Sequence, residues 1–594
     1  MNALTPQMQT HRFAAGPLTL GWCEGQLQYI RLGDREIVRR IYVGVRDAGW
    51  QTVPGIIHNL SFDSVADGFV VRWDSVHTAG ALKFRWHGTV TGDGKGVVEF
   101  TMEGEALSQF AANRIGICVL HPVDELRGVR CRIETTQGQS TRAEFPKLIH
   151  PHLPFSNVRA MRYAYPDGVE ISLAFDGDTF ETEDQRQWGD ASWKTYSRPS
   201  ALPKPFEVRA GQRFAQSVTL AVAAGPQSAV PWRPPQMCRM TVEPSVGHEL
   251  PAIGVAWNGT ALTAWQRETL GRVAPAHVRV YLVPARDGLV AALQSASNEA
   301  QALGTSLNLV ASLTRSPAAE IATLIEALEL VRPKVQSLTV MSLVDALPSV
   351  ALVRSAKKAV ANCLRGVPVG LGVRPYFTEL NRNRDMVADA DFVSVPWSPS
   401  VHLDDDATIV ENLPSLLAAA ETFRSFAGSK ALVLDRVSLR DARQGTLFVG
   451  GFVVGHLAIA ARAGISRVTL FDPGGLADKE TQAFPMFHVL CDIAEFGGTV
   501  ALKTRVSQPQ HVASLVLQRE RSVRVLLANL QATEIAVELQ LPSLGTTGFL
   551  RRLGVQQWQD AVAQPNVFRA RPASAWAGSP VVLGPHEIVR LDLA

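Results

Sequence analysis

The sequence feature that most constrains the fold is a regular alternation of short apolar runs and amphipathic stretches between about residues 250 and 505. Helical stretches such as Leu289–Ala302 and Pro317–Val331 separate eight apolar runs that predict strands. These runs are Ala252–Ala256, Val278–Leu282, Leu307–Ala311, Ser337–Met341, Val367–Val373, Phe392–Val395, Ala431–Leu434 and Arg467–Phe471. Eight strands alternating with helices are typical of a (β/α)8 TIM barrel. A doubly wound sheet would also alternate, but the turn after the first run, up to Gly259, is not the glycine-rich turn that binds phosphate.

The segments before and after this region have the period-two alternation of β-strands. Runs such as Leu82–Val90 and Val97–Glu103 predict an antiparallel β-sandwich, and a proline-rich stretch from Pro226 to Pro235 predicts a linker. Strand patterns return after residue 510. We therefore expect three domains: an N-terminal β-sandwich at 1–235, a TIM barrel at 245–505 and a small C-terminal β-sandwich at 510–594.

The charge balance argues against polyanionic partners. Lys and Arg number 58 against 55 Asp and Glu, a formal net charge of +3, so we expect no nucleic acid partner and no anionic membrane surface. Six scattered cysteines without a CxxC pair disfavour disulfides and structural zinc. With no signal peptide pattern at the start and no long apolar run, we expect a cytoplasmic protein that binds a small molecule. The sequence makes no prediction of oligomeric state.

In a TIM barrel, the residues that follow each strand gather at the carboxyl end, where active sites form. After the fifth strand lie Tyr376, Glu379, Asn381 and Arg382, a mixture that suits a hydroxylated substrate, although a solvated surface loop has the same composition. The eighth strand ends in Asp472, a candidate acid or base, although Asp-Pro-Gly-Gly is also an ordinary turn.

The other strand ends add three candidates. His402 and Asp405 follow the sixth strand, where Asp405 is also suited to cap a helix. Three carboxylates near His402 keep a divalent metal as a minor alternative, but no HxH or HExxH spacing supports it, and we expect no cofactor. Arg279 alternates with apolar neighbours on the second strand, so it needs a buried partner or a ligand.

A dense polar and aromatic segment, Phe180–Tyr196, shows neither strand nor helix periodicity. It predicts a loop that packs on the barrel, or one that reaches its mouth to bind substrate. Its candidate substrate-binding residues are Glu183, Asp184, Arg186, Trp188, Asp190 and Lys194.

Four segments carry a resemblance to a known family. Asn113–Pro122, Glu183–Tyr196, Phe377–Arg382 and Pro399–Asp406 together resemble the D-apionate lactonase family, over nearly the whole chain. The resemblance implies an N-terminal β domain, a TIM-barrel middle and a C-terminal β domain. It also implies hydrolysis of the lactone of a branched sugar acid in bacterial sugar catabolism.

Ring opening needs an activated water, an acid for the departing alkoxide and donors for the oxyanion. We assign Glu379 as general base and Asp472 as the second carboxylate, with Arg279, Arg382 or His402 stabilising negative charge. One alternative is a glycoside hydrolase, which needs two facing carboxylates. A third hypothesis is a carbohydrate-binding protein built on a decayed barrel.

Overall fold

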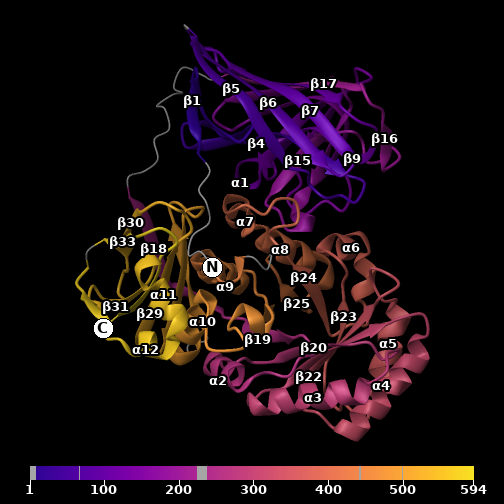
Figure 1. The fold of residues 1–594 in the computed structure, drawn as a ribbon, viewed down its shortest axis with the longest axis vertical. Coiled ribbons are helices and arrows are strands. Elements are labelled where there is room, and N and C mark those ends of the chain that lie inside the picture. The colour runs from indigo at the N-terminus through magenta and orange to yellow at the C-terminus, as the bar shows by residue number, and fades with distance from the viewer. Residues whose placement is uncertain are drawn as a thin grey trace. The chain divides into compact units, whose positions relative to one another are not determined.

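The structure, a computed structural model, describes residues 9–65, 67–223, 237–439, 443–497, 500–578 and 580–593. These residues fall into two compact units (Figure 1). The first unit holds residues 9–186 and 191–223, and the second holds 187–190 together with the chain from 237 onward. The segment 187–190 therefore belongs with the second unit, although the chain on both sides of it belongs to the first. The proline-rich linker predicted at 226–235 lies outside the described residues.

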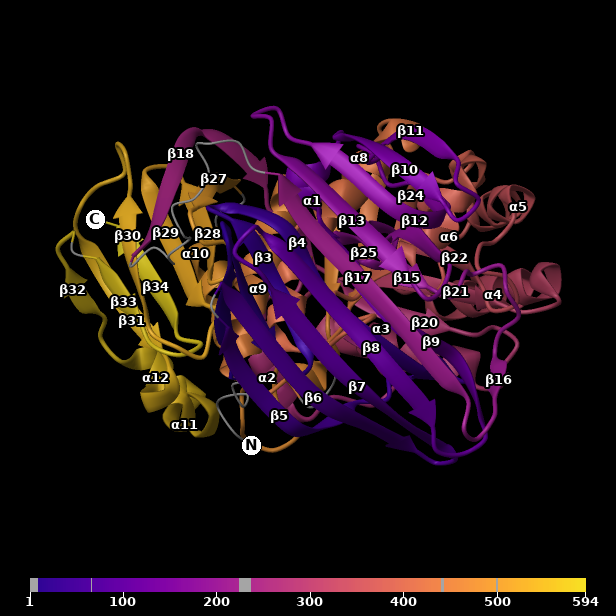
Figure 2. The same cartoon turned by 90° about the horizontal axis from the view of Figure 1, so that it is seen from above.

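The first unit is an antiparallel β-sandwich, as predicted. One layer runs β5-β6-β7-β8-β17-β13-β12-β10-β11, and its broad central part is seen face-on in Figure 2. The other layer runs β1-β2-β3-β4-β9-β15-β14, and β16 also pairs with β9. The core between the layers includes Trp73, Phe100, Ile117 and Trp193. The strands are β1 (His11–Ala15), β2 (Leu18–Cys23), β3 (Gln26–Leu32), β4 (Arg35–Asp47), β5 (Gly55–Val65), β6 (Gly68–Ala79), β7 (Leu82–Gly92), β8 (Val97–Ala106), β9 (Phe110–Pro122), β10 (Arg130–Thr135), β11 (Ser140–Glu144), β12 (Phe155–Ala164), β13 (Glu170–Asp176), β14 (Phe180–Asp184), β15 (Ser192–Ser197), β16 (Phe206–Val208) and β17 (Arg213–Ala223), and α1 (Val123–Leu126) follows β9.

The segment Phe180–Tyr196 is not the irregular loop that its sequence predicts. It forms β14, the short 3-10 helix η1 (Gln185–Trp188) and β15, and β14 pairs with β15. All six residues of β15 are buried on both faces of the strand. A strand without an exposed face has no polar and apolar alternation, which explains why periodicity missed it.

The second unit contains the predicted closed barrel of eight parallel strands. Its strands agree with the predicted runs to within a few residues: β19 (Ala252–Trp257), β20 (Val278–Leu282), β21 (Leu307–Leu313), β22 (Val335–Ser342), β23 (Val369–Gly372), β24 (Phe392–Trp397), β25 (Ala431–Val437) and β26 (Arg467–Leu470). Each strand pairs in parallel with the next, and β19 pairs with β26 to close the ring. Their carboxyl ends therefore converge at one mouth.

The helices of the barrel begin where the sequence offers caps. Thr263 caps α2 (Ala264–Val273) in a capping box with Gln266, and α4 (Pro317–Val331) starts with proline in its first turn. The others around the barrel are α3 (Leu289–Ala302), α5 (Val350–Val360), α6 (Phe377–Arg382), α7 (Asp406–Asn412), α8 (Ser415–Ala427), α9 (Leu447–Arg462) and α10 (Pro485–Phe496), with 3-10 turns η2 (Arg384–Val387) and η4 (Pro473–Gly475). No helix in the described ranges has the length and apolarity needed to cross a lipid bilayer.

The remaining strands form a nine-stranded sheet that takes in parts of the chain on both sides of the barrel. β18 (Cys238–Glu249) precedes the barrel, yet it pairs with β27 (Val500–Val506) and with β30 (Ile535–Gln540). The predicted barrel range of 245–505 thus contains part of β18 and most of β27, both of which belong to this sheet. Its other elements are β28 (Val512–Arg519), β29 (Ser522–Asn529), β31 (Gly548–Leu553), β32 (Ser574–Trp576), β33 (Val581–Leu583) and β34 (Ile588–Leu593), with α11 (Val555–Ala563) and α12 (Pro565–Ala570) beside them (Figure 1).

Five buried histidines predict a loss of stability in mild acid. Burial lowers the pKa of His121, His277 and His488 to about 3 and of His456 and His586 to about 4. The unfolded chain takes up these protons near pH 6.5, whereas the folded chain does not, so the free energy of unfolding falls as the pH drops below 6.5. Each histidine contributes a slope of up to about 1.4 kcal/mol per pH unit.

We therefore expect thermal unfolding at pH 5.5 to begin at a temperature several degrees below that at pH 7.5. Replacing the exposed His58 with Gln leaves this difference unchanged, and replacing the buried His488 with Asn reduces it. An unfolding temperature that stays constant or rises on acidification would show that these imidazoles are not held neutral.

Candidate functional site

A cavity of about 580 Å³ opens at the carboxyl ends of four consecutive barrel strands. Fourteen described residues line it, and they follow or end β23, β24, β25 and β26: Pro375, Tyr376, Pro396, Trp397, Ser398, Ser400, Val401, Arg436, Val437, Ser438, Leu439, Gln444, Phe471 and Asp472. This volume lies within the range of small-molecule sites, roughly 300–1,000 Å³. The cavity is therefore the candidate active site.

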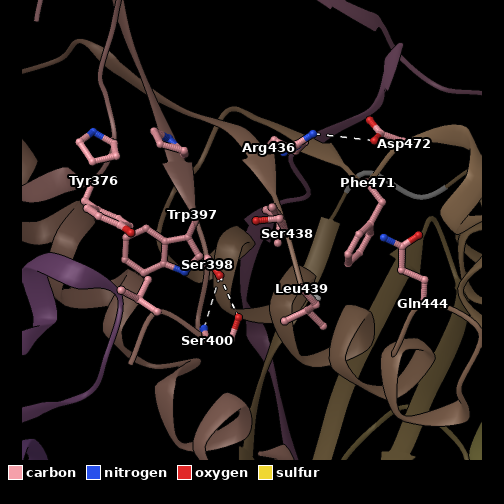
Figure 3. Close-up of a pocket in the computed structure, with 14 residues that line it drawn as sticks. Tyr376, Trp397, Ser398, Ser400, Arg436, Ser438, Leu439, Gln444, Phe471 and Asp472 are labelled. Carbon is pink, nitrogen blue, oxygen red and sulfur yellow. Dashed lines mark hydrogen bonds and ion pairs between the residues drawn. The ribbon is translucent and has the colours of Figure 1, made fainter. Parts of the chain in front are cut away.

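The lining combines aromatic rings with small hydrogen-bonding groups. Tyr376 and Trp397 lie on one side of the cavity and Phe471 on the other, with the Ser438 hydroxyl between them (Figure 3). Ser398 and Ser400 bring their Oγ atoms to 3.1 Å from each other. Flat apolar rings beside hydroxyl groups suit a compact polyol that presents both C–H and O–H groups.

Asp472 and Arg436 provide the charges of the lining. Asp472 Oδ2 lies 3.8 Å from Arg436 Nη1, and both side chains are partly exposed to the cavity (Figure 3). The turn after β26 uses the backbone carbonyl of Asp472, which accepts from Gly475 N at 2.9 Å, rather than its carboxylate. Asp472 can therefore belong to a turn and also be a functional residue, because the turn uses its backbone carbonyl and the cavity is lined by its side chain.

Beneath the mouth, a buried ion pair crosses the barrel interior. Arg279 on β20 forms an ion pair with Asp435 on β25, and its Nη2 donates to Ser394 Oγ at 3.1 Å. The Tyr281 hydroxyl donates to Asp435 Oδ1. Burial disfavours the charged guanidinium, but Asp435 and Tyr281 outweigh this, so the pKa of Arg279 is raised. The Arg279 side chain is 1% exposed and is not among the residues that line the cavity, so its role as a substrate ligand stays a prediction.

Asp435→Asn should therefore destabilise the barrel strongly. The substitution leaves the buried Arg279 charge without a counter-charge, and breaking such a pair costs about 3–5 kcal/mol. Denaturant unfolding followed by tryptophan fluorescence measures the loss. The double variant Arg279→Met, Asp435→Leu should recover most of it, and failure of the double variant to recover would mean that the pair is not what holds these strands.

Beside the cavity, His402 and Asp190 form a hydrogen-bonded pair. His402 Nδ1 lies 2.6 Å from Asp190 Oδ2, and the preceding residue, Val401, lines the cavity. Asn412 Nδ2 donates to the other oxygen of Asp190 at 3.2 Å and to the Pro399 carbonyl at 2.8 Å. The carboxylate fixes Nδ1 as the protonated nitrogen, so the neutral ring carries its lone pair on Nε2.

The segment 187–190 reaches this pair through close contacts with the barrel. Gly189 has φ 101°, and a Cβ there would lie 2.7 Å from the Ser398 carbonyl oxygen, so the close approach requires glycine. Thr378 Oγ1 donates to Gln187 Oε1 at 2.7 Å. The Trp188 ring lies edge-on to Tyr376, 5.2 Å between centroids, and 6.4 Å from the His402 ring. The prediction that this segment packs on the barrel is therefore correct for these four residues.

The segment after β23 contains a helix that the sequence analysis missed. In α6 the buried residues are Phe377, Thr378, Leu380 and Asn381, which face the protein interior. Glu379 lies on the other face, is partly exposed and is not among the lining residues. Its role as general base stays a prediction, and Asp472 is the carboxylate that lines the cavity.

The neighbours of Glu379 have other contacts. Asn381 is buried and accepts from Arg384 Nη2 at 2.8 Å, and the exposed Arg382 lies 5.9 Å from the Trp188 ring. Of the residues predicted after the fifth strand, Tyr376 reaches the cavity.

The other residues predicted to bind substrate make hydrogen bonds or ion pairs with other side chains and backbone groups of the protein. Asp405 caps α7 by accepting from Thr408 N at 2.9 Å. Asp184 and Arg186 form an ion pair at 2.7 Å in the first unit, with neither side chain exposed. Lys194 and Glu183 also form an ion pair in that unit.

Several lining residues were not predicted, because their types are common. Trp397, Ser398, Ser438 and Phe471 stand at the ends of β24, β25 and β26, and that position is the signal that could have found them. Gln444 lies farther along, shortly before α9. Among the described residues, no three His, Cys, Asp or Glu side chains form a group that could hold a metal ion.

Family models for three domains match this chain in order. They are the N-terminal domain of D-apionate lactonase at residues 1–225, its TIM barrel domain at 251–440 and its C-terminal immunoglobulin-like domain at 509–591. The chain belongs to the D-apionate lactonase family. The resemblance seen in the sequence is thereby confirmed, and so is the order of a β domain, a TIM barrel and a second β domain.

A D-apionate lactonase from Brucella anthropi is 25% identical to this family member over 568 residues, covering 87% of this chain and 92% of that protein. Among solved structures, a xyloglucanase of glycoside hydrolase family 44 from Paenibacillus polymyxa is 10% identical with a TM-score of 0.44, covering 61% of this chain and 100% of that one. The α-L-arabinofuranosidase AbfB from Bifidobacterium longum is 11% identical with a TM-score of 0.44, at the same coverage. TM-scores this low carry no argument about this chain.

Proposed function

We propose that this protein hydrolyses the lactone ring of a sugar acid similar to D-apionolactone. The observation that carries the proposal is the cavity at the ends of β23 to β26, which holds a carboxylate and a guanidinium among hydroxyls and aromatic rings, in a chain of this family. Lactone opening needs that set of groups: one that accepts a proton from water, and one that stabilises the oxyanion.

Recognition of the substrate rests on the neutral part of the lining. Tyr376, Trp397 and Phe471 offer apolar faces to the C–H groups of a five-membered sugar lactone. Ser398, Ser400, Ser438 and Gln444 offer hydrogen bonds to its hydroxyls. A lactone is uncharged before it opens, and the near-neutral composition of the chain agrees with an uncharged substrate.

In the proposed reaction, the Asp472 carboxylate takes a proton from the water that attacks the lactone carbonyl carbon. Arg436 stabilises the negative charge that forms on the carbonyl oxygen. The bond between the carbonyl carbon and the ring oxygen then breaks, and the ring oxygen leaves as an alcohol after it receives a proton. The products are one carboxylate and one released proton at neutral pH.

His402 is the proposed donor of the proton to the ring oxygen. For this step its ring carries protons on both Nδ1 and Nε2, and it regains the Nε2 proton from solvent after the ring has opened. Its Nδ1 is held by Asp190, so its other nitrogen is the one that exchanges protons. Two residues that line the cavity lie near His402. Val401 precedes it in the chain, and Tyr376 packs against the Trp188 ring, which also lies beside the His402 ring. Asp190 is then a positioning residue that acts through His402.

Proton release in a pH-stat tests the proposed activity. The purified chain should release one proton per molecule of D-apionolactone faster than the lactone hydrolyses alone, and it should release no nitrophenol from aryl glycosides. Nitrophenol release without lactone opening would assign the cavity to a glycosidase instead.

A further inference from the structure

The turn after β26 contains two adjacent glycines whose surroundings differ. They are Gly474 and Gly475, the last two residues of η4, and Gly475 N donates to the Asp472 carbonyl at 2.9 Å. Gly475 is buried and Gly474 is exposed. Neither glycine is among the residues that line the cavity, so a role of Gly475 in substrate binding has to act through a neighbouring side chain.

The side chain that packs against Gly475 is Gln444, which lines the cavity. A Cβ at position 475 would lie 2.9 Å from Gln444 Oε1 and 3.4 Å from its Cδ, so the amide occupies the space that a side chain there needs. A Cβ at Gly474 would meet no described atom beyond its chain neighbours within 4 Å. Because neither glycine has a positive φ, an alanine fits the backbone at both positions, and only the alanine at 475 displaces the glutamine.

The backbone on both sides of Gln444 is fixed by hydrogen bonds. The Arg443 carbonyl accepts from Thr446 N at 2.9 Å and from Thr446 Oγ1 at 2.8 Å. The Gly445 carbonyl accepts from Trp558 Nε1, on α11, at 3.4 Å. With its backbone held at the start of α9, the glutamine depends on the contact with Gly475 for the orientation of its amide.

The amide of Gln444 lies beside the Phe471 ring in the cavity. Figure 3 shows the amide nitrogen on the side of this ring and the amide oxygen on the side away from it. Phe471 itself has φ 30°, in the left-handed region that a residue with a Cβ rarely adopts. Backbone strain of this kind concentrates at binding and active sites. The turn after β26 is therefore shaped around the cavity and presents an N–H donor at its edge.

We propose that Gly475 is a positioning residue that holds the Gln444 amide where its nitrogen donates to a hydroxyl of the sugar lactone. This contact selects hydroxylated lactones over unsubstituted ones. The proposal rests on the proposed function, because that function supplies the substrate class. A side chain held in its binding orientation loses less conformational entropy when the ligand binds. A donor aimed at a substrate hydroxyl also discriminates against an analogue that lacks this hydroxyl, since the donor then loses its partner.

Isothermal titration calorimetry with D-apionolactone tests the role of Gly475. The Asp472→Asn variant of the full chain is the parent, so that binding is measured without turnover. Adding Gly475→Ala should weaken binding about 10-fold, the contribution of one well-placed hydrogen bond. Gly474→Ala is the matched control and should leave the affinity unchanged. Thermal unfolding of each variant checks that it is folded, and a Gly475→Ala variant that is folded and binds like the parent would overturn the proposal.

A double-variant comparison shows whether Gly475 acts through Gln444. Gln444→Ala should weaken binding about as much as Gly475→Ala, and the two together should weaken it no further. A Cβ at position 475 would also lie 3.2 Å from Phe471 Cβ. If Gly475→Ala weakens binding equally when Gln444 is already alanine, the effect runs through Phe471 and the proposal is wrong.

The kinetic parameters separate positioning from a general loss of structure. In the chain that retains Asp472, Gly475→Ala should raise KM for D-apionolactone about 10-fold and change kcat by less than about threefold, because it weakens binding of the substrate and of the transition state alike. A fall in kcat with an unchanged KM would indicate fewer folded molecules instead, and would contradict a positioning role.

γ-Butyrolactone, a five-membered lactone without hydroxyls, tests the selection. Its affinity for the Asp472→Asn parent is measured by displacement of D-apionolactone, and the preference for D-apionolactone should fall about 10-fold in the Gln444→Ala variant. An unchanged preference, or no binding of D-apionolactone to the parent, would overturn the proposal. Lactone hydrolysis by the unsubstituted chain is measured separately: its absence would refute the proposed function, whereas its presence beside an unchanged preference would refute only the selection by Gln444.

Discussion

Asp472→Asn is expected to lower kcat for lactone hydrolysis by about 10²–10⁴-fold, the usual contribution of a general base. The amide keeps the size of the side chain that lines the cavity beside Arg436, but it cannot accept a proton from water. KM should change little, because the carboxylate acts on water rather than on the sugar. Steady-state rates in a pH-stat separate the two parameters.

Two control variants sharpen this prediction. Glu326→Gln, on the exposed face of α4, should leave kcat unchanged. Glu379→Gln tests whether Glu379 or Asp472 is the general base. The sequence-based assignment predicts near-complete loss of activity in this variant, whereas the position of Glu379 on α6 predicts that most activity remains. An Asp472→Asn enzyme as active as the wild type would remove Asp472 from the mechanism.

His402→Gln should also lower kcat by about 10²–10⁴-fold, since the leaving ring oxygen would lack its proton donor. Asp190→Asn should have a smaller effect, on the order of 10–100-fold, because the histidine remains but its tautomer is no longer fixed. The distinguishing readout is the pH profile of kcat. Its basic limb, where a proton donor loses its proton, should shift in Asp190→Asn and disappear in His402→Gln.

A purely structural role for the pair predicts a different pattern. In that case both variants would unfold at lower temperature while the folded fraction keeps the wild-type pH profile. Asn412→Ala, which removes the second hydrogen bond to Asp190, provides the comparison. It should lower kcat less than Asp190→Asn does, since His402 keeps its partner.

The barrel could be predicted from the sequence because its strands are short apolar runs that helices separate. The helix ranges Leu289–Ala302 and Pro317–Val331 agree with α3 and α4 in the structure. Between β24 and β25 the chain forms two helices, α7 and α8, with Pro414 between them. β18 was missed as part of the C-terminal sheet, because a strand that pairs across about 260 residues of chain leaves no local pattern.

The site could be predicted only in part, because strand-end position alone does not fix where a side chain points. Asp472 and Tyr376 follow β26 and β23 closely, so the barrel geometry carries them into the cavity. Glu379 lies farther from the end of β23, within α6. The helical period of α6 places its side chain on the face opposite the buried residues. The contact between Asp190 and His402 joins residues 212 apart, and only the tertiary structure places them together.

The crystal structure of the Asp472→Asn variant soaked with D-apionolactone tests the central claim most directly. The account predicts an intact lactone in the cavity, with its ring against Tyr376, its carbonyl oxygen within hydrogen-bond distance of Arg436 and a water beside residue 472. A lactone bound elsewhere, or one whose carbonyl faces away from Arg436, would contradict the account.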